Sequence, residues 1–262
     1  MRLSKILLAM AVTTSLVTTA LAFSAGSAAA GGRITDAKRV VFIVPGGQQL
    51  YNSGETHQAT YRALDKALSA AGYETHFVDA PGKMIAADAE LIADSIRSYA
   101  AGADSVGGVI AHSAGGLSSR YYAKFLGGSE VVDSFVAIGA PQYGSPGGCV
   151  QGPADGYDTC MFSEVLTKLN AGEDTPGSAY YSVVQSSGEW ADGRLDGGAS
   201  AGCTSMAFPG AGTGGDHLTE LEHPEVISGA ISALGGRDCV GTFVDENDGD
   251  ITWPDTLFPS FR

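Results

Sequence analysis

Basic residues are scarce in this chain of 262 residues, in which 15 Lys and Arg are set against 29 Asp and Glu. Arg2 and Lys5 fall in an N-terminal leader, so the rest of the chain is strongly acidic. Nucleic acids and anionic membranes both attract positive charge. We therefore expect neither of them as a partner.

Long apolar runs are also lacking, with the exception of residues 6–23, which follow a short basic start. Ala28 and Ala30 are small residues placed as in a cleavage site, so residues 1–30 are predicted to be a secretory signal peptide. The alternative is an uncleaved membrane anchor, because the run is nearly long enough to span a bilayer. We expect a secreted, extracellular protein without stable membrane anchoring after the signal is removed.

Only 4 cysteines occur, Cys149, Cys160, Cys203 and Cys239, and none forms a Cys-x-x-Cys pair. This spacing disfavours zinc binding and thiol redox chemistry. In an exported chain the cysteines predict two disulfides, for which three connectivities are possible. Proximity in sequence favours Cys149 with Cys160 and Cys203 with Cys239.

The chain beyond the signal is long enough for one α/β domain with a full core, which we place at residues 31–240. Residues 241–262 form an acidic and aromatic tail. The segment 245–250 resembles a calcium loop, but its glycine falls one position early and no glutamate closes it. A solvated acidic tail is favoured, and we expect no metal.

Runs rich in β-branched residues alternate with segments of helical periodicity along the domain. Strands are predicted at 39–44, 73–78, 106–110, 131–138, 180–185 and 204–208, and helices at 60–70, 86–100, 117–126, 162–169 and 224–234. This alternation predicts an α/β fold with a mostly parallel central sheet and helices on both faces. Catalytic groups are then expected at the carboxyl ends of the strands.

The pentapeptide Ala111-His112-Ser113-Ala114-Gly115 joins an apolar run to an amphipathic stretch. A serine on such a strand-to-helix elbow is exposed to a histidine that can take its proton. A second match, Gly198-Ala199-Ser200-Ala201-Gly202, follows a polar glycine-rich stretch and has no strand before it. Ser113 is therefore the predicted nucleophile, and its alternative role is an ordinary helix N-cap.

The chain has 5 histidines, His57, His76, His112, His217 and His223. His217 is the predicted base, because it lies between the last strand and the last helix, as the order Ser, acid, His requires. His112 is next to the nucleophile, but its side chain should point off the elbow. His223 precedes Pro224 and suits a capping region.

The acid that orients the base belongs on the loop after the strand at 180–185. Glu189 comes first on this loop and is the predicted acid, with Asp192 and Asp196 as alternatives. The oxyanion hole requires two backbone donors, and we predict Ala114 and Gly47 for them. The alternative for Gly46-Gly47 is a bare tight turn.

Taken together, several segments resemble the small bacterial class 2 lipases of the α/β-hydrolase superfamily. They are Val41-Phe42-Ile43-Val44-Pro45-Gly46-Gly47, Ile110-Ala111-His112-Ser113-Ala114-Gly115-Gly116, Tyr181-Ser182-Val183-Val184-Gln185-Ser186-Ser187-Gly188-Glu189 and His217-Leu218-Thr219-Glu220-Leu221. The resemblance implies an α/β-hydrolase fold without a separate lid domain and hydrolysis of triacylglycerols or other carboxylic esters. The family usually has His-Gly in place of Pro45-Gly46, and aspartate in place of Glu189.

We therefore expect a monomeric serine ester hydrolase that works through an acyl-enzyme and needs no cofactor. Its catalytic residues would be Ser113, Glu189 and His217. An acyltransferase or a polyester depolymerase could use the same triad. A non-catalytic binding protein on a hydrolase scaffold is the alternative from another class.

Overall fold

The computed structural model describes residues 39–47, 59–100, 106–177, 179–186, 195, 206–208, 216–234 and 256. These residues belong to one unit, Lys38–Arg262. The predicted signal peptide, the tail apart from Thr256, and the pair Cys203 and Cys239 lie outside the described residues. Within the described part of the chain, no helix is long and apolar enough to cross a membrane.

The described strands form a parallel sheet of six strands in the order β2-β1-β3-β4-β5-β6. The strands are β1 (Arg39–Val44), β2 (Tyr73–Phe77), β3 (Gly108–His112), β4 (Ser134–Ile138), β5 (Tyr180–Ser186) and β6 (Met206–Phe208). The order reverses between β1 and β3. Open α/β sheets bind ligands at this point, beside the carboxyl ends of the strands.

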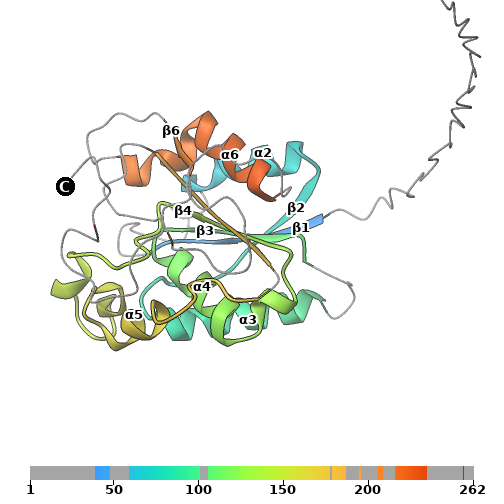
Figure 1. Cartoon of the computed structure of the whole chain (residues 1–262). Helices are drawn as coiled ribbons and strands as arrows, with labels where there is room; N and C mark the ends of the chain where they lie inside the picture. Colours follow the sequence, from blue (N-terminus) through green and yellow to red (C-terminus); the bar gives the residue numbers. More distant parts are fainter. Residues whose placement is uncertain are drawn as a thin grey trace, which may run out of the picture. The chain divides into compact units, whose positions relative to one another are not determined.

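Helices cover both faces of the sheet, as predicted (Figure 1). On one face lie α2 (Arg62–Ala70) and α6 (Pro224–Leu234). On the other lie α3 (Ile85–Ala100), α4 (Ala114–Phe125) and the short α5 (Glu164–Leu169). This layering is the reason for the alternating sequence pattern, because each connection between consecutive strands from β1 to β5 carries a helix back across the sheet.

The strand β1 is buried on both sides, because successive side chains point to opposite faces. Val41 and Ile43 pack in the cluster beneath α2 and α6. Phe42 and Val44 pack in the cluster on the side of α3 and α4. A strand buried in this way reads as a continuous apolar run rather than an alternating one.

The boundaries of several elements differ from those predicted. The strand β3 extends to His112, and α4 begins at Ala114, three residues before the predicted start at 117. The helix α5 begins at Glu164 because the hydroxyl of Ser163 accepts a hydrogen bond from the Leu166 N–H at 3.1 Å. Such a cap satisfies a backbone donor that the first turn leaves unpaired.

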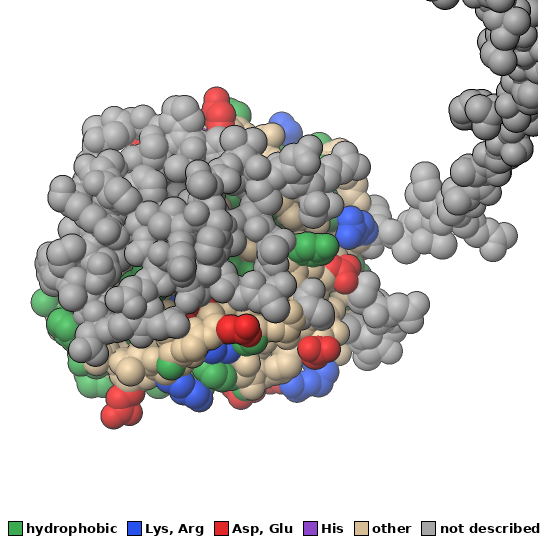
Figure 2. Space-filling model, viewed as in Figure 1, with side chains coloured by type: hydrophobic (Ala, Val, Ile, Leu, Met, Phe, Trp, Pro, Cys, Tyr) green, Lys and Arg blue, Asp and Glu red, His purple; other side chains and the backbone are tan. Residues whose placement is uncertain are grey.

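Charged side chains of both signs are dispersed over the described part of the face drawn in Figure 2. Arg120 is different, because it is 0 % exposed within the protein. Its guanidinium donates to Asp174 Oδ1 at 2.6 Å, to the carbonyl of Gln142 at 3.0 Å and to Asn170. It therefore ties α4 to the segments that follow β4 and α5.

We expect Arg120→Ala to lower the free energy of unfolding by about 3 to 5 kcal/mol, because it leaves the buried Asp174 carboxylate without its cation. Arg97→Ala is the matched control, since Arg97 pairs with Asp94 at the same 2.6 Å but on the surface. Removing an exposed pair should cost less than about 1 kcal/mol. Urea unfolding of both variants measures the difference, and equal losses would contradict the structural role given to Arg120.

Candidate active site

Ser113 occupies the sharp turn between β3 and α4. Its φ and ψ are 53° and −131°, and it is the only non-glycine residue with positive φ in the described part of the chain. Backbone strain of this kind is maintained only where the surrounding structure enforces it, and nucleophile elbows are such places. Ser113 stands at the N-cap position of α4, but its side chain makes no capping hydrogen bond there.

The elbow lies tightly against the turn that follows β1. A Cβ atom on Gly115 would come within 2.3 Å of the carbonyl oxygen of Pro45. A Cβ atom on Gly46 would come within 2.7 Å of the Ser113 Cβ. Both positions therefore need glycine, because real Cβ atoms do not approach backbone or side-chain atoms this closely.

His217 contacts the serine although the two are 104 residues apart. Its Nε2 lies 2.9 Å from Ser113 Oγ. His217 belongs to the short 3₁₀ helix η5 (Asp216–Leu218), which precedes η6 (Glu220–Glu222) and α6. The structure thus brings together the two residues singled out from the sequence as nucleophile and base.

The other described histidines lie elsewhere or make other contacts. His223 stands before α6, and its carbonyl accepts a hydrogen bond from the Ile227 N–H at 3.0 Å. His76 is on β2 and contacts Glu74. His57 and the three acid candidates Glu189, Asp192 and Asp196 lie outside the described residues, so the acid stays a prediction.

Gly47 and Ala114 line one cavity together with Ser113 and His217. The neighbouring Gly46 N–H donates instead to the hydroxyl of Tyr61 at 2.9 Å. Gly82 also lines the cavity and packs closely against the turn, because a Cβ atom there would lie 2.6 Å from the Gly47 Cα. The sequence analysis missed Gly82, for which the dipeptide Pro81-Gly82 is only a general turn signal.

The cavity has a volume of about 290 Å³, and one loop supplies most of its wall. The disulfide between Cys149 and Cys160 closes this loop, which confirms the predicted pairing. Closing a loop of this length is worth roughly 3 kcal/mol by chain entropy. The described lining residues contain no large aliphatic side chain; those from the loop are Ser145, Gly147, Gly148, Gln151, Asp155, Gly156 and Thr159.

Two acidic side chains accept backbone hydrogen bonds at the start of α3, and one of them, Asp158, attaches the loop there. Asp158 Oδ2 accepts a hydrogen bond from the Ile85 N–H at 2.9 Å, and Asp88 Oδ2 accepts one from the Lys83 N–H at 2.9 Å. Burial raises the pKa of Asp88 from 3.8 to about 6, and burial also raises the pKa of Asp158. Lys83 Nζ lies 3.3 Å from Asp155, at the surface.

We expect the raised pKa of Asp88 to make the protein less stable as the pH rises from about 4 to above 6. In this window the folded state binds more protons than the unfolded state, so stability falls with increasing pH. Asp88→Asn removes the titration, so its stability relative to the wild type should rise across the window. Denaturant unfolding at several pH values measures this, with the exposed Asp94→Asn as control; a pH-independent difference for Asp88→Asn would contradict the prediction.

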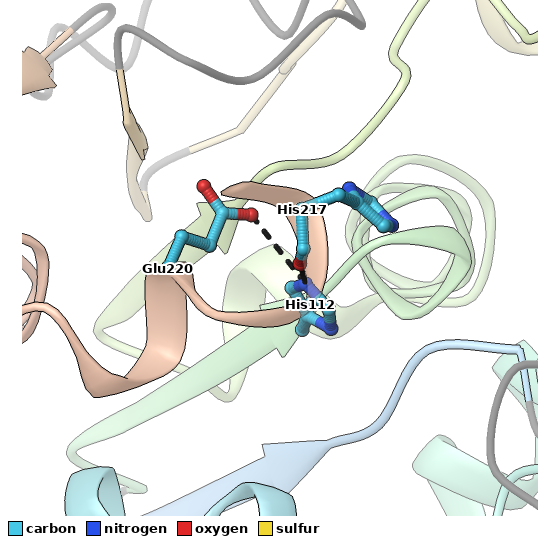
Figure 3. Close-up of side chains that lie close together, drawn as sticks. All are labelled: His112, His217 and Glu220. Atoms are coloured by element: carbon cyan, nitrogen blue, oxygen red, sulfur yellow. Dashed lines mark hydrogen bonds and ion pairs between the residues drawn. The ribbon is translucent and has the colours of Figure 1, made fainter. Parts of the chain in front are cut away.

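Two buried side chains, His112 and Glu220, lie close to the predicted base His217 (Figure 3). His112 and Glu220 are 1 % and 0 % exposed, and His112 Nε2 lies 3.4 Å from Glu220 Oε1. The same Nε2 lies 2.9 Å from the carbonyl oxygen of His217, and the imidazole rings of His112 and His217 lie 5.0 Å apart, centroid to centroid. His112 Nδ1 lies 3.0 Å from the hydroxyl of Tyr61.

The potential ligand atoms of His112, His217 and Glu220 lie within 4.8 Å of one another. However, the Nδ1 and Nε2 atoms of His112 already face Tyr61 and the His217 carbonyl, and His217 Nε2 faces Ser113. Metal binding through Nε2 of either ring would break these contacts. The arrangement therefore fits a hydrogen-bond network better than a metal centre.

The sequence analysis expected the His112 side chain to point off the elbow, and it did not identify Tyr61 or Glu220 as parts of the site. Tyr61 falls within the helix predicted at 60–70, and its side chain is fully buried. Glu220 follows His217 by three residues. This spacing alone carries little information, because acidic residues are common in the chain.

No protein-family model matches the sequence, and no curated protein matches it. Among solved structures, lipase B of Aspergillus fumigatus superposes with a TM-score of 0.61 at 20 % identity, covering 77 % of this chain and 53 % of its own. This chain thus spans about half the length of that lipase. The fold is accordingly the α/β-hydrolase fold, as predicted.

Two further structures are more distant. Est1E of Butyrivibrio proteoclasticus has a TM-score of 0.49 at 14 % identity, covering 76 % of this chain and 89 % of its own. The mature form of Bacillus licheniformis lipase BlEst2 has a TM-score of 0.47 at 16 % identity, covering 62 % of this chain and 68 % of its own.

Proposed function

We propose that this chain is a secreted serine hydrolase of carboxylic esters, with Ser113 as nucleophile and His217 as base. The observation that carries the proposal is the 2.9 Å contact between Ser113 Oγ and His217 Nε2 on a strained elbow. A nucleophile within hydrogen-bond reach of a base, beside a cavity, is the arrangement that acyl transfer requires. The similarity to the solved lipase supports the same reaction class.

In the proposed reaction, the Ser113 hydroxyl gives its proton to His217 Nε2 as Oγ attacks the ester carbonyl. The backbone N–H groups of Gly47 and Ala114 stabilise the resulting oxyanion. The imidazolium then protonates the leaving alkoxide as the C–O bond breaks, which leaves an acyl-enzyme on Ser113. Water gives a proton to His217 as it attacks the acyl carbon, and the returning proton releases the acid and restores the serine.

Glu189 is the proposed acid that holds the imidazole of His217 in the correct tautomer and stabilises its charged form. Asp192 is the alternative on the same loop. The relationship to the small lidless class 2 lipases belongs to this proposal, as do secretion, the monomeric state and the independence from cofactors.

Transfer to an alcohol and depolymerisation of polyesters are further reactions for the same triad. In an acyltransferase, an alcohol competes with water for the acyl-enzyme. In a polyester depolymerase, a polymer film competes with soluble esters for the free enzyme.

We expect Ser113→Ala to lower kcat for p-nitrophenyl ester hydrolysis by about 10⁴-fold or more, because the attacking atom is removed. The circular dichroism spectrum should remain unchanged. Ser119→Ala is the matched control, since Ser119 is a buried serine on the same helix. It should retain both the hydrolytic activity and the spectrum.

A fluorophosphonate probe tests the nucleophile independently of the substrate. The wild type and Ser119→Ala should be labelled covalently, and Ser113→Ala should not. A binding protein on a hydrolase scaffold would leave all three unlabelled. Retained hydrolysis or labelling in Ser113→Ala would refute the assignment of the nucleophile.

We expect Glu189→Ala to lower kcat by about 10⁴-fold, because the base then loses the group that orients it. Asp192→Ala and Asp196→Ala should change kcat little in the same assay. If Asp192→Ala gives the large loss instead, Asp192 is the acid and Glu189 is an ordinary loop residue.

A further inference from the structure

We infer that His112 is a positioning residue, which holds the base His217 and the turn of Gly46 and Gly47 (the oxyanion turn) at the correct distance from Ser113. The inference rests on the proposed function, since it concerns the geometry of Ser113 and His217. His112 is the last residue of β3 and is bonded directly to Ser113 through the chain. Its ring contacts the base segment at one nitrogen and, through Tyr61, the turn after β1 at the other.

The contact with the base segment is made to the backbone of the base itself. A carbonyl oxygen can only accept, so His112 Nε2 is the donor in its 2.9 Å contact with the His217 carbonyl. This bond fixes the position of the His217 main chain. It therefore also fixes the Cα from which the imidazole reaches Ser113 Oγ.

The contact with the oxyanion turn passes through Tyr61. The Gly46 N–H donates to the Tyr61 hydroxyl at 2.9 Å, and this hydroxyl lies 3.0 Å from His112 Nδ1. With the Nε2 proton on a neutral ring, Nδ1 is an acceptor and the tyrosine donates to it. Gly46 immediately precedes Gly47, the proposed oxyanion donor, so a shift of the His112 ring moves this donor too.

Glu220 supports the orientation of the ring. Its Oε1 lies 3.4 Å from His112 Nε2, and the carboxylate is fully buried. An acceptor oxygen beside Nε2 favours the proton on that nitrogen, which is the tautomer that the His217 carbonyl requires. Glu220 comes from η6, directly after the base segment, so both partners of the ring move together.

The expected loss of kcat on replacing His112 can be estimated, because the rate of the reaction falls steeply when the reacting groups are displaced. A displacement of about 1 Å at the reacting groups can cost on the order of 100-fold in rate. The ring is 1 % exposed and packed on several sides, so its replacement changes the positions of Gly46 and His217 relative to Ser113. The substrate wall formed by the disulfide loop is a separate segment, and substrate affinity should change less than turnover.

Two substitutions at position 112 distinguish the contact made at Nε2 of the ring from the contact made at Nδ1. The amide of His112→Gln can place a donor near the site of Nε2, whereas the shorter amide of His112→Asn reaches only the site of Nδ1. We expect His112→Asn to lower kcat for p-nitrophenyl acetate by about 10- to 100-fold, with KM changed by less than about 3-fold. His112→Gln should restore most of this loss, which simple filling of space would not achieve.

Substitutions at the two partners of the ring have matched controls. Tyr61→Phe should lower kcat, while Tyr122→Phe, which removes the hydroxyl of a buried tyrosine on the other side of the sheet, should not. Glu220→Gln should lower kcat, while Glu222→Gln on the exposed side of η6 should not. The second-order rate of fluorophosphonate labelling should fall by a similar factor in the affected variants. Circular dichroism and thermal unfolding verify that each variant is folded.

The outcomes distinguish this inference from the proposed function. If the wild type neither hydrolyses esters nor reacts with the probe, the proposed function is overturned, and this inference with it. If the wild type is active and the folded His112→Asn, Tyr61→Phe and Glu220→Gln retain wild-type kcat, the positioning role alone is wrong. The positioning role is also wrong if His112→Asn and His112→Gln lower kcat equally. It is wrong as well if the substitutions at His112, Tyr61 and Glu220 lower activity only by unfolding the protein.

Discussion

The close approach between the turn after β1 and the elbow after β3 is the constraint on which the site depends. The parallel register pairs Val44 with Ala111, so the two strands end side by side. Glycine at 46 and 115 then lets the backbones meet at distances that a side chain would prevent. This contact maintains the positive φ of Ser113 and brings Gly47 to the same cavity as the hydroxyl. The strained backbone at Ser113, the proposed nucleophile, is thus held in place by packing.

Two kinds of structure surround the cavity. The end of the sheet carries Ser113 and the turn of Gly47, and the buried His112 links both to the segment of His217. The opposite wall is a loop without regular strands, closed by a disulfide and attached to α3 through Asp158. The groups proposed for chemistry therefore lie on the rigid scaffold, whereas the surface proposed to receive the substrate lies on a loop, as is common in enzymes.

Much of this arrangement was predictable from local sequence. The buried strands read as β-branched runs ending at glycine turns, and the amphipathic helices read as periodic apolar positions such as Ile92 and Ile96. Ser113 and His217 could be paired because the order of the elements brings the ends of parallel strands together. The partners of His112 could not, because Tyr61 and Glu220 meet it only through polar side-chain contacts between segments distant in the sequence. Neither periodicity nor spacing encodes such contacts, and the same holds for Gly82 against Gly47.

The cross-linked loop has a consequence for how such a protein can diversify. The bond between Cys149 and Cys160 closes the intervening stretch into a loop, which Asp158 attaches to α3 through the Ile85 N–H. Residues that face the cavity, such as Gln151, can be exchanged there without disturbing the pairing of any strand. Under the proposed function, substitutions on this loop can change which substrates fit, while the proposed catalytic residues at the end of the sheet stay unchanged.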